Sequence, residues 1–154
     1  MDNIKIINDC AYKVGYVIPG FVPKTLEPYT TIEIDSKELL ALASMAGGRT
    51  LLEEKMLLLE NEELYQQFGI YPNEDDYTTD EIIELVVPTR INELDDILSY
   101  CSDSTLDKII THVIASVDDY NIIQLVQNRT KKDITGMKEE VMALQASKAR
   151  QKKR

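Results

Sequence analysis

Residues 30–43 read TTIEIDSKELLALA, and this stretch passes from a strand pattern to a helix pattern within a few residues. Ile32 and Ile34 alternate with polar neighbours, which is typical of a short strand with one buried face. Asp35 then predicts a helix start, because its carboxylate can accept a hydrogen bond from an unpaired backbone amide while Glu38 reciprocates. The stretch therefore predicts a lobe that combines strands with helices.

The residues before this stretch also favour strands. Asn3–Ile7 and Tyr12–Ile18 are rich in β-branched and aromatic residues, and Asn8–Cys10 is interpreted as the turn between them. Prolines within residues 18–23 then interrupt regular pairing, because proline donates no hydrogen bond to a neighbouring strand. We expect a small antiparallel sheet of two to four strands with exposed edges.

Gly47, Gly48 and Arg49 follow the predicted helix and indicate a structural corner between two helices. Glycine adopts a left-handed helix cap at the least cost, so the two glycines are expected to end the first helix. A phosphate-binding loop would need a Gly-x4-Gly-Lys-Ser/Thr pattern, which these residues do not supply.

The residues after the corner complete a first lobe. A second short helix is expected over Thr50–Lys55, and Met56–Leu59 is interpreted as a strand because a helix cap follows it at Asn61. That cap begins a helix which Gly69 closes. We expect residues 1–70 to form a small α+β lobe.

The hydrophobic period changes after the polar segment Tyr71–Tyr77. Apolar residues now recur at helical spacing, as in Ile91, Leu94, Ile97 and Leu98. Helices are also expected over Asp80–Val87, Ser104–Val117, Asp119–Gln127 and Ile134–Arg150. The predicted fold class is therefore α+β: an N-terminal antiparallel sheet with short helices, then a C-terminal bundle of four or five short helices at residues 71–147, and a basic helical tail at 148–154.

The sign of the charge reverses near the C-terminus. Residues 1–128 hold 24 Asp or Glu and eight Lys or Arg, whereas residues 129–154 hold three and nine. The basic residues that we assign to partner or phosphate binding are Arg129, Lys131, Lys132, Lys148, Arg150, Lys152, Lys153 and Arg154. An acidic body with a basic end indicates a protein that binds something negative, either nucleic acid or an acidic protein surface.

Three interpretations of this basic end stay open. It can contact phosphates without sequence preference, it can bind the acidic body of an identical copy, or it can be a solubilising helix end whose cations complement the helix dipole. Because the acidic body repels a phosphate backbone, any contact with nucleic acid is expected through the tail alone.

Residues with catalytic or metal-binding chemistry lack the companions that such sites need. The acidic group Glu74–Asp76, with Asp80 and Glu81, has no central glycine of the kind that a calcium-binding loop requires. His112 is the only histidine, and neither cysteine stands at ligand spacing from it. We expect no metal, no cofactor and no enzymatic activity.

Two further patterns bear on location. No window approaches 18 consecutive apolar residues, so we expect no membrane-spanning segment. The first ten residues, MDNIKIINDC, lack the basic region and apolar run of a secretory signal. We expect synthesis in the cytoplasm.

Five short motifs carry a resemblance to a known group of proteins. They are Ile18–Pro23 (IPGFVP), Gly47–Arg49 (GGR), Leu51–Glu53 (LLE), Asn61–Glu63 (NEE) and Thr79–Ile83 (TDEII). In this order they resemble small proteins that tailed bacteriophages encode near their head and connector genes. The resemblance covers about two-thirds of the chain, and it departs at Ala46, where that group is expected to have proline.

The resemblance implies a non-enzymatic virion structural or accessory protein, made in the host cytoplasm and located in the virion. Its implied partners are other virion proteins (capsid, portal or connector), with a homo-oligomer and a non-specific DNA contact through the tail as further options. The alternative hypothesis is an intracellular regulatory adaptor that binds a protein partner or nucleic acid through the basic tail.

Overall fold

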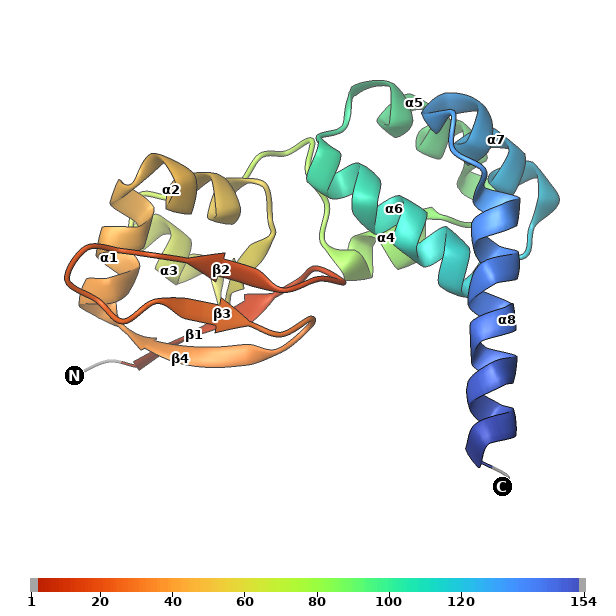
Figure 1. The fold of residues 1–154 in the computed structure, drawn as a ribbon. Helices are drawn as coiled ribbons and strands as arrows, with labels where there is room; N and C mark the ends of the chain where they lie inside the picture. Colours follow the sequence, from red (N-terminus) through yellow and green to blue (C-terminus); the bar gives the residue numbers. More distant parts are fainter. Residues whose placement is uncertain (1–2, 153–154) are drawn as a thin grey trace. The chain divides into compact units, whose positions relative to one another are not determined.

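The computed structural model describes the backbone of residues 3–152 and the side chains of residues 3–150. Over these residues the fold is α+β, with a small antiparallel sheet near the N-terminus followed by helices, which confirms the predicted fold class (Figure 1). The chain divides into two compact units: residues up to Thr79 with Ser102–Thr105, and Asp80–Cys101 with Leu106 onward. The predicted limits of the α+β lobe (1–70), the helical lobe (71–147) and the basic tail (148–154) stay a prediction.

The described strands of the first unit form two antiparallel sheets. The three-stranded sheet has the order β4 (Thr31–Asp35), β1 (Asn3–Asn8) and β5 (Leu57–Leu59), so the N-terminal strand is central. The two-stranded sheet pairs β2 (Val14–Tyr16) with β3 (Lys24–Leu26). The sequence suggested that the first two strands pair with each other across a turn at Asn8–Cys10. This is wrong, because β1 pairs with β4 and β5, and β2 pairs with β3.

The strand register explains which residues form the core. Ile4 of β1 pairs with Ile34 of β4, and all the side chains on this face point inward because alternate residues of a strand share a face. Leu57 and Leu59 of β5 are buried beside Ile6, and this confirms the predicted strand. The strand β3 was not predicted, because Pro23 directly before it indicated a break in pairing.

Three short helices pack against these sheets, as Figure 1 shows: α1 (Ser36–Ser44), α2 (Ala46–Glu53) and α3 (Glu62–Gln67). The predicted cap of α1 is confirmed, since the Asp35 carboxylate accepts a hydrogen bond of 2.7 Å from the amide of Lys37. The reciprocal role of Glu38 is wrong. Its side chain is buried and accepts a hydrogen bond of 2.6 Å from the hydroxyl of Tyr16 instead.

The corner between α1 and α2 lies at Met45, which is extended (φ −91°, ψ 138°), and the left-handed cap at the glycines is wrong. Gly47 and Gly48 belong to the first turn of α2. A Cβ on Gly48 would lie 2.3 Å from the carbonyl oxygen of Leu42, so glycine is required here by close approach to α1. Arg49 donates hydrogen bonds to Glu53 and to the carbonyl of Gly69, and thereby links α2 to the end of α3.

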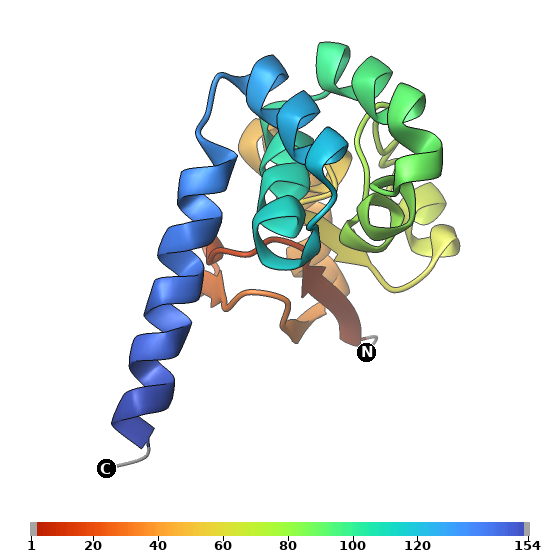
Figure 2. The same ribbon diagram turned by 90° about the vertical axis from the view of Figure 1, so that its right-hand side faces the viewer.

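The helices assigned mainly to the second unit follow the predicted spacing closely. They are α4 (Thr79–Leu85), the short 3₁₀ helix η1 (Pro88–Arg90), α5 (Ile91–Tyr100), α6 (Asp103–Ser116), α7 (Tyr120–Thr130) and α8 (Ile134–Lys152). Leu94, Ile97, Ile109, Val113 and Ile122 are buried between them. In the two views of Figures 1 and 2, α8 begins beside α7 and then leaves the other helices.

Candidate functional site: the α8 arm

The start of α8 is fixed by local contacts. The Asp133 carboxylate accepts a hydrogen bond of 3.0 Å from the amide of Gly136, and the side chain of Gln127 accepts one of 2.8 Å from the amide of Thr135. Ile134 is fully buried, and it anchors the helix to its own unit. These contacts satisfy amides that the first turn of a helix leaves unpaired.

Lys138 holds the next turn of α8 against the end of α6. Its ammonium group donates hydrogen bonds of 2.9 and 3.1 Å to the carbonyl oxygens of Val113 and Ile114, and it lies 3.7 Å from the Asp118 carboxylate. A cation is favoured there because the carbonyl groups at the C-terminal end of a helix carry partial negative charge. This role was not predicted, since Val113 and Ile114 lie 25 and 24 residues from Lys138 in the chain.

From Glu139 to Arg150, the last residue whose side chain is described, the helix has no packing partner in its unit. Every residue from Glu139 to Arg150 is exposed, and we call this segment the α8 arm. Its exposed apolar side chains include Met142 at 66% and Leu144 at 60%. A lone helix of about 12 residues is marginally stable in water, so a helical arm with exposed apolar residues indicates a surface that binds a partner.

The charges of the α8 arm are separated along its length. Glu139 and Glu140 lie at the end near the helical unit, whereas Lys148 and Arg150 lie at the distal end. Among the residues that the structure describes, none of these four side chains takes part in an ion pair or a side-chain hydrogen bond. Their charges are therefore available to a partner.

The basic residues predicted as one site lie in two places. Lys131 and Lys132 are exposed at the turn between α7 and α8, where Lys131 adopts the left-handed cap conformation (φ 61°). Arg129 forms an ion pair of 2.6 Å with Asp95 of α5 and is thereby engaged in the fold. Lys148 lies 14 residues further along the helix than Ile134, or about 21 Å. The structure does not bring the two groups together.

Three predicted residues of the basic end lie outside the described side chains. For Lys152 only the backbone is described, and it continues α8. Lys153 and Arg154 lie outside the described residues altogether. The described part of the predicted site at this end is therefore Lys148 with Arg150.

A second polar group, in the first unit, surrounds the buried Asp76. The Asp76 carboxylate accepts hydrogen bonds from Asn73 (3.0 Å), from Thr105 (2.8 Å) and from the Ser102 hydroxyl. The Lys55 ammonium donates a bond of 2.6 Å to the backbone carbonyl of Asp76. The contacts fix Ser102–Thr105 to the first unit, and the carboxylate oxygens are occupied by internal donors. We interpret this cluster as structural.

Burial shifts the pKa of two side chains that could take part in chemistry. Burial, with the nearby carboxylates of Asp76 and Asp103, raises the pKa of Glu54 above its ordinary value. Burial lowers the pKa of His112, which favours its neutral form. Within the described residues no three His, Cys, Asp or Glu side chains are grouped as a metal site would require.

A pocket of about 280 Å³ lies in the first unit between β2 and the α1–α2 corner. Gly15 and Gly48 contribute no side chain to its wall, and Leu42 and Leu51 make it apolar. The one titratable side chain in the lining is Tyr16, whose hydroxyl is already bonded to Glu38. The pocket therefore presents no free acid, base or nucleophile.

Within the described residues no helix has both the length and the apolar character needed to cross a membrane. Comparison of the chain with protein-family models, with curated proteins and with solved structures found no match. The α8 arm is thus assigned as the candidate site from its own geometry.

Proposed function

We propose that the protein is a non-enzymatic structural or accessory component of a bacteriophage particle, and that it binds other virion proteins such as the capsid, portal or connector. The observation that carries a binding role is the α8 arm, which is exposed along its whole described length and displays apolar and charged side chains that have no partner among the described residues. The bacteriophage setting rests on the sequence resemblance stated above.

The composition of the α8 arm favours a protein partner over nucleic acid. Leu144 and Val141 are exposed apolar side chains near its centre, and Glu139 and Glu140 would repel a phosphate backbone. Only Lys148 and Arg150 of the described arm favour phosphate. A protein surface can bind apolar, acidic and basic side chains at the same time.

Quantitative mass spectrometry of purified particles tests the proposal. We expect the protein at a fixed copy number per particle, and its absence from particles would overturn the virion role. A chain ending at Lys138 should be lost from particles because it lacks the α8 arm, whereas a chain ending at Arg150 should be retained. Circular dichroism and thermal unfolding of both truncated proteins control for loss of folding.

The regulatory-adaptor alternative makes a different prediction. If Lys148 and Arg150 contact nucleic acid, the purified protein should bind DNA at low salt, and the binding should fall steeply as salt rises. The double variant Lys148→Gln, Arg150→Gln should then lose that binding. Binding of this kind, together with absence from particles, would favour the adaptor.

A further inference from the structure

The α8 arm carries one stripe of side chains at the spacing that pairs two helices. Met137, Val141, Leu144 and Lys148 follow one another at intervals of four, three and four residues, which places them on the same side of a helix. Met137 is partly buried at the base, while Val141 and Leu144 are exposed at 37% and 60%. Met142, at 100° per residue, lies well off this stripe.

Two opposite charges, Glu140 beside the stripe and Lys148 at its distal end, cannot pair within the same helix. Glu140 borders the stripe on the proximal side of Leu144, and Lys148 continues it on the distal side. Opposite charges stabilise one helix when they are three or four residues apart, but Glu140 and Lys148 are eight apart. Neither residue takes part in an ion pair or a side-chain hydrogen bond in the described chain.

These charges complement each other only when two copies of the arm run in opposite directions. In an antiparallel pair centred between Val141 and Leu144, each Val141 faces a Leu144 of the other copy. Lys148 of each copy then comes within about one turn of Glu140 of the other, which gives two reciprocal ion pairs. A parallel pair would instead place Lys148 beside Lys148 in the seam, which is repulsive, and would keep Glu140 about eight residues away from either Lys148.

We propose that the α8 arm binds the α8 arm of a second copy of this chain, in an antiparallel pair with Val141 and Leu144 at its centre. The pairing goes beyond the proposed function and does not depend on it, because it assigns the arm a second copy of the chain as its partner. The contact is short, about 20 Å of helix, so the dimer is weak and reversible. Each copy carries a net charge of −10, and physiological salt screens the resulting long-range repulsion.

Sedimentation equilibrium of the full chain at physiological salt, over a range of protein concentrations, measures this pairing. We expect a monomer–dimer equilibrium. Leu144→Ser should weaken it at least about tenfold, equivalent to about 1.4 kcal/mol. Met142→Ser removes an equally exposed apolar side chain off the stripe, and it should leave the equilibrium unchanged.

Charge exchange tests the direction of the pair. Glu140→Lys alone and Lys148→Glu alone should each weaken the dimer, since each places like charges together. The double variant carrying both substitutions should restore it, because the opposite charges again face each other. Restoration is expected only for an antiparallel pair; in a parallel pair the double variant keeps like charges together.

The outcomes separate this inference from the proposed function. A protein that stays monomeric at all concentrations, or a dimer that Leu144→Ser does not affect, overturns the pairing even where the protein is found in virions. A dimer that Leu144→Ser weakens but the double charge variant fails to restore overturns the antiparallel arrangement. Absence from virions overturns the proposed function and leaves the solution result standing.

Discussion

The buried polar groups of the first unit and the exposed polar groups of the α8 arm differ in whether the chain itself satisfies them. Asn8 is completely buried, and both polar atoms of its side-chain amide are hydrogen-bonded: the nitrogen donates to the Tyr12 carbonyl, and the oxygen accepts from the Cys10 amide. Within the described residues no buried side-chain nitrogen or oxygen lacks a hydrogen-bond partner. Glu140 and Lys148, by contrast, form no ion pair or side-chain hydrogen bond with any other described residue. Polar side chains of the first kind stabilise the fold, whereas those of the second kind are available for binding.

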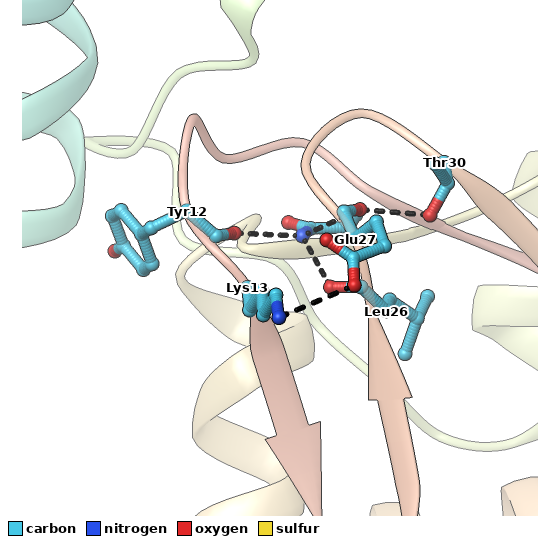
Figure 3. A network of polar contacts seen from close by, with 6 residues as sticks. Tyr12, Lys13, Leu26, Glu27 and Thr30 are labelled. Atoms are coloured by element: carbon cyan, nitrogen blue, oxygen red, sulfur yellow. Dashed lines mark hydrogen bonds and ion pairs between the residues drawn. The ribbon is translucent and has the colours of Figure 1, made fainter.

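The clearest example of the first kind is drawn in Figure 3. The amide nitrogen of the Asn8 side chain donates to the backbone carbonyls of Tyr12 (2.8 Å), Leu26 (3.1 Å) and Glu27 (3.1 Å). The Glu27 carbonyl also accepts a bond of 2.7 Å from the hydroxyl of Thr30. One side chain thus joins the turn after β1 to the end of β3.

The largest effect on stability is expected for Asn8→Asp. The substitution keeps the shape but replaces the donor with a carboxylate that faces three carbonyl oxygens, and we expect a loss of about 3 kcal/mol or more. Urea unfolding at neutral pH measures it. Asn61→Asp is the matched control: Asn61 is an exposed helix cap, and aspartate caps equally well. A small effect of Asn8→Asp would contradict the role of the Asn8 amide as a buried hydrogen-bond donor.

The two glycines of α2 should respond in opposite directions. Gly48→Ala places a Cβ 2.3 Å from the Leu42 carbonyl oxygen, and we expect it to destabilise the protein by about 2–3 kcal/mol. Gly47→Ala meets nothing within 4 Å and should stabilise by about 0.5–1 kcal/mol, because alanine loses less backbone entropy in a helix. Thermal unfolding of the two variants side by side measures the difference. Equal effects would contradict the close approach of α1 and α2.

Tyr16→Phe tests the buried pair of Tyr16 and Glu38. Burial and the hydrogen bond to Glu38 raise the pKa of Tyr16, which therefore stays protonated and donates at neutral pH. Without the hydroxyl, the buried Glu38 carboxylate keeps only Lys24, at 4.0 Å, and we expect a loss of about 2 kcal/mol. Denaturant unfolding measures it, and Tyr71→Phe at a 75% exposed position should have no effect.

Glu54→Gln should produce a small gain that depends on pH. Because burial and neighbouring carboxylates raise the pKa of Glu54 in the fold, its ionisation costs stability as pH rises from the unfolded value through the folded value. Glutamine removes this cost, so the variant should be more stable at pH 7 and equal to the parent below about pH 4. Glu93→Gln should instead be less stable than the parent at pH 7 and equal to it at low pH, since the hydrogen bond from Arg90 lowers the pKa of Glu93. Thermal unfolding between pH 3 and pH 8 measures both trends.

The sequence predicts elements whose determinants are local, and it misses contacts between distant residues. Asp35 and Asn61 were identified as helix caps because a cap and its amides lie within three residues. The roles of Asn8 and Lys138 could not be found in this way, since Leu26 lies 18 residues from Asn8 and Val113 lies 25 residues from Lys138. The two glycines of α2 were expected at a turn, although Gly48 is required by contact with another helix.

The candidate site was predicted in part. The reversal of charge directed attention to the C-terminal segment, and Lys148 and Arg150 are indeed exposed there. Composition could not show that Arg129 is engaged with Asp95, or that Val141 and Leu144 face solvent, because a helix of this pattern is usually buried on its apolar side. Only the three-dimensional arrangement reveals a helix without a neighbour.

The smallest effect on stability is expected at the α8 arm itself. Leu144→Ser changes an apolar side chain, as Leu52→Ser would in the core, but Leu144 is 60% exposed and Leu52 is completely buried. In dilute protein, where the chain is monomeric, Leu144→Ser should change the free energy of unfolding by less than about 0.5 kcal/mol, whereas Leu52→Ser should lower it by about 3 kcal/mol or more. Urea unfolding at low protein concentration measures both. A large loss for Leu144→Ser under these conditions would show that the arm packs within its own chain, and its charges and apolar stripe would then belong to the fold.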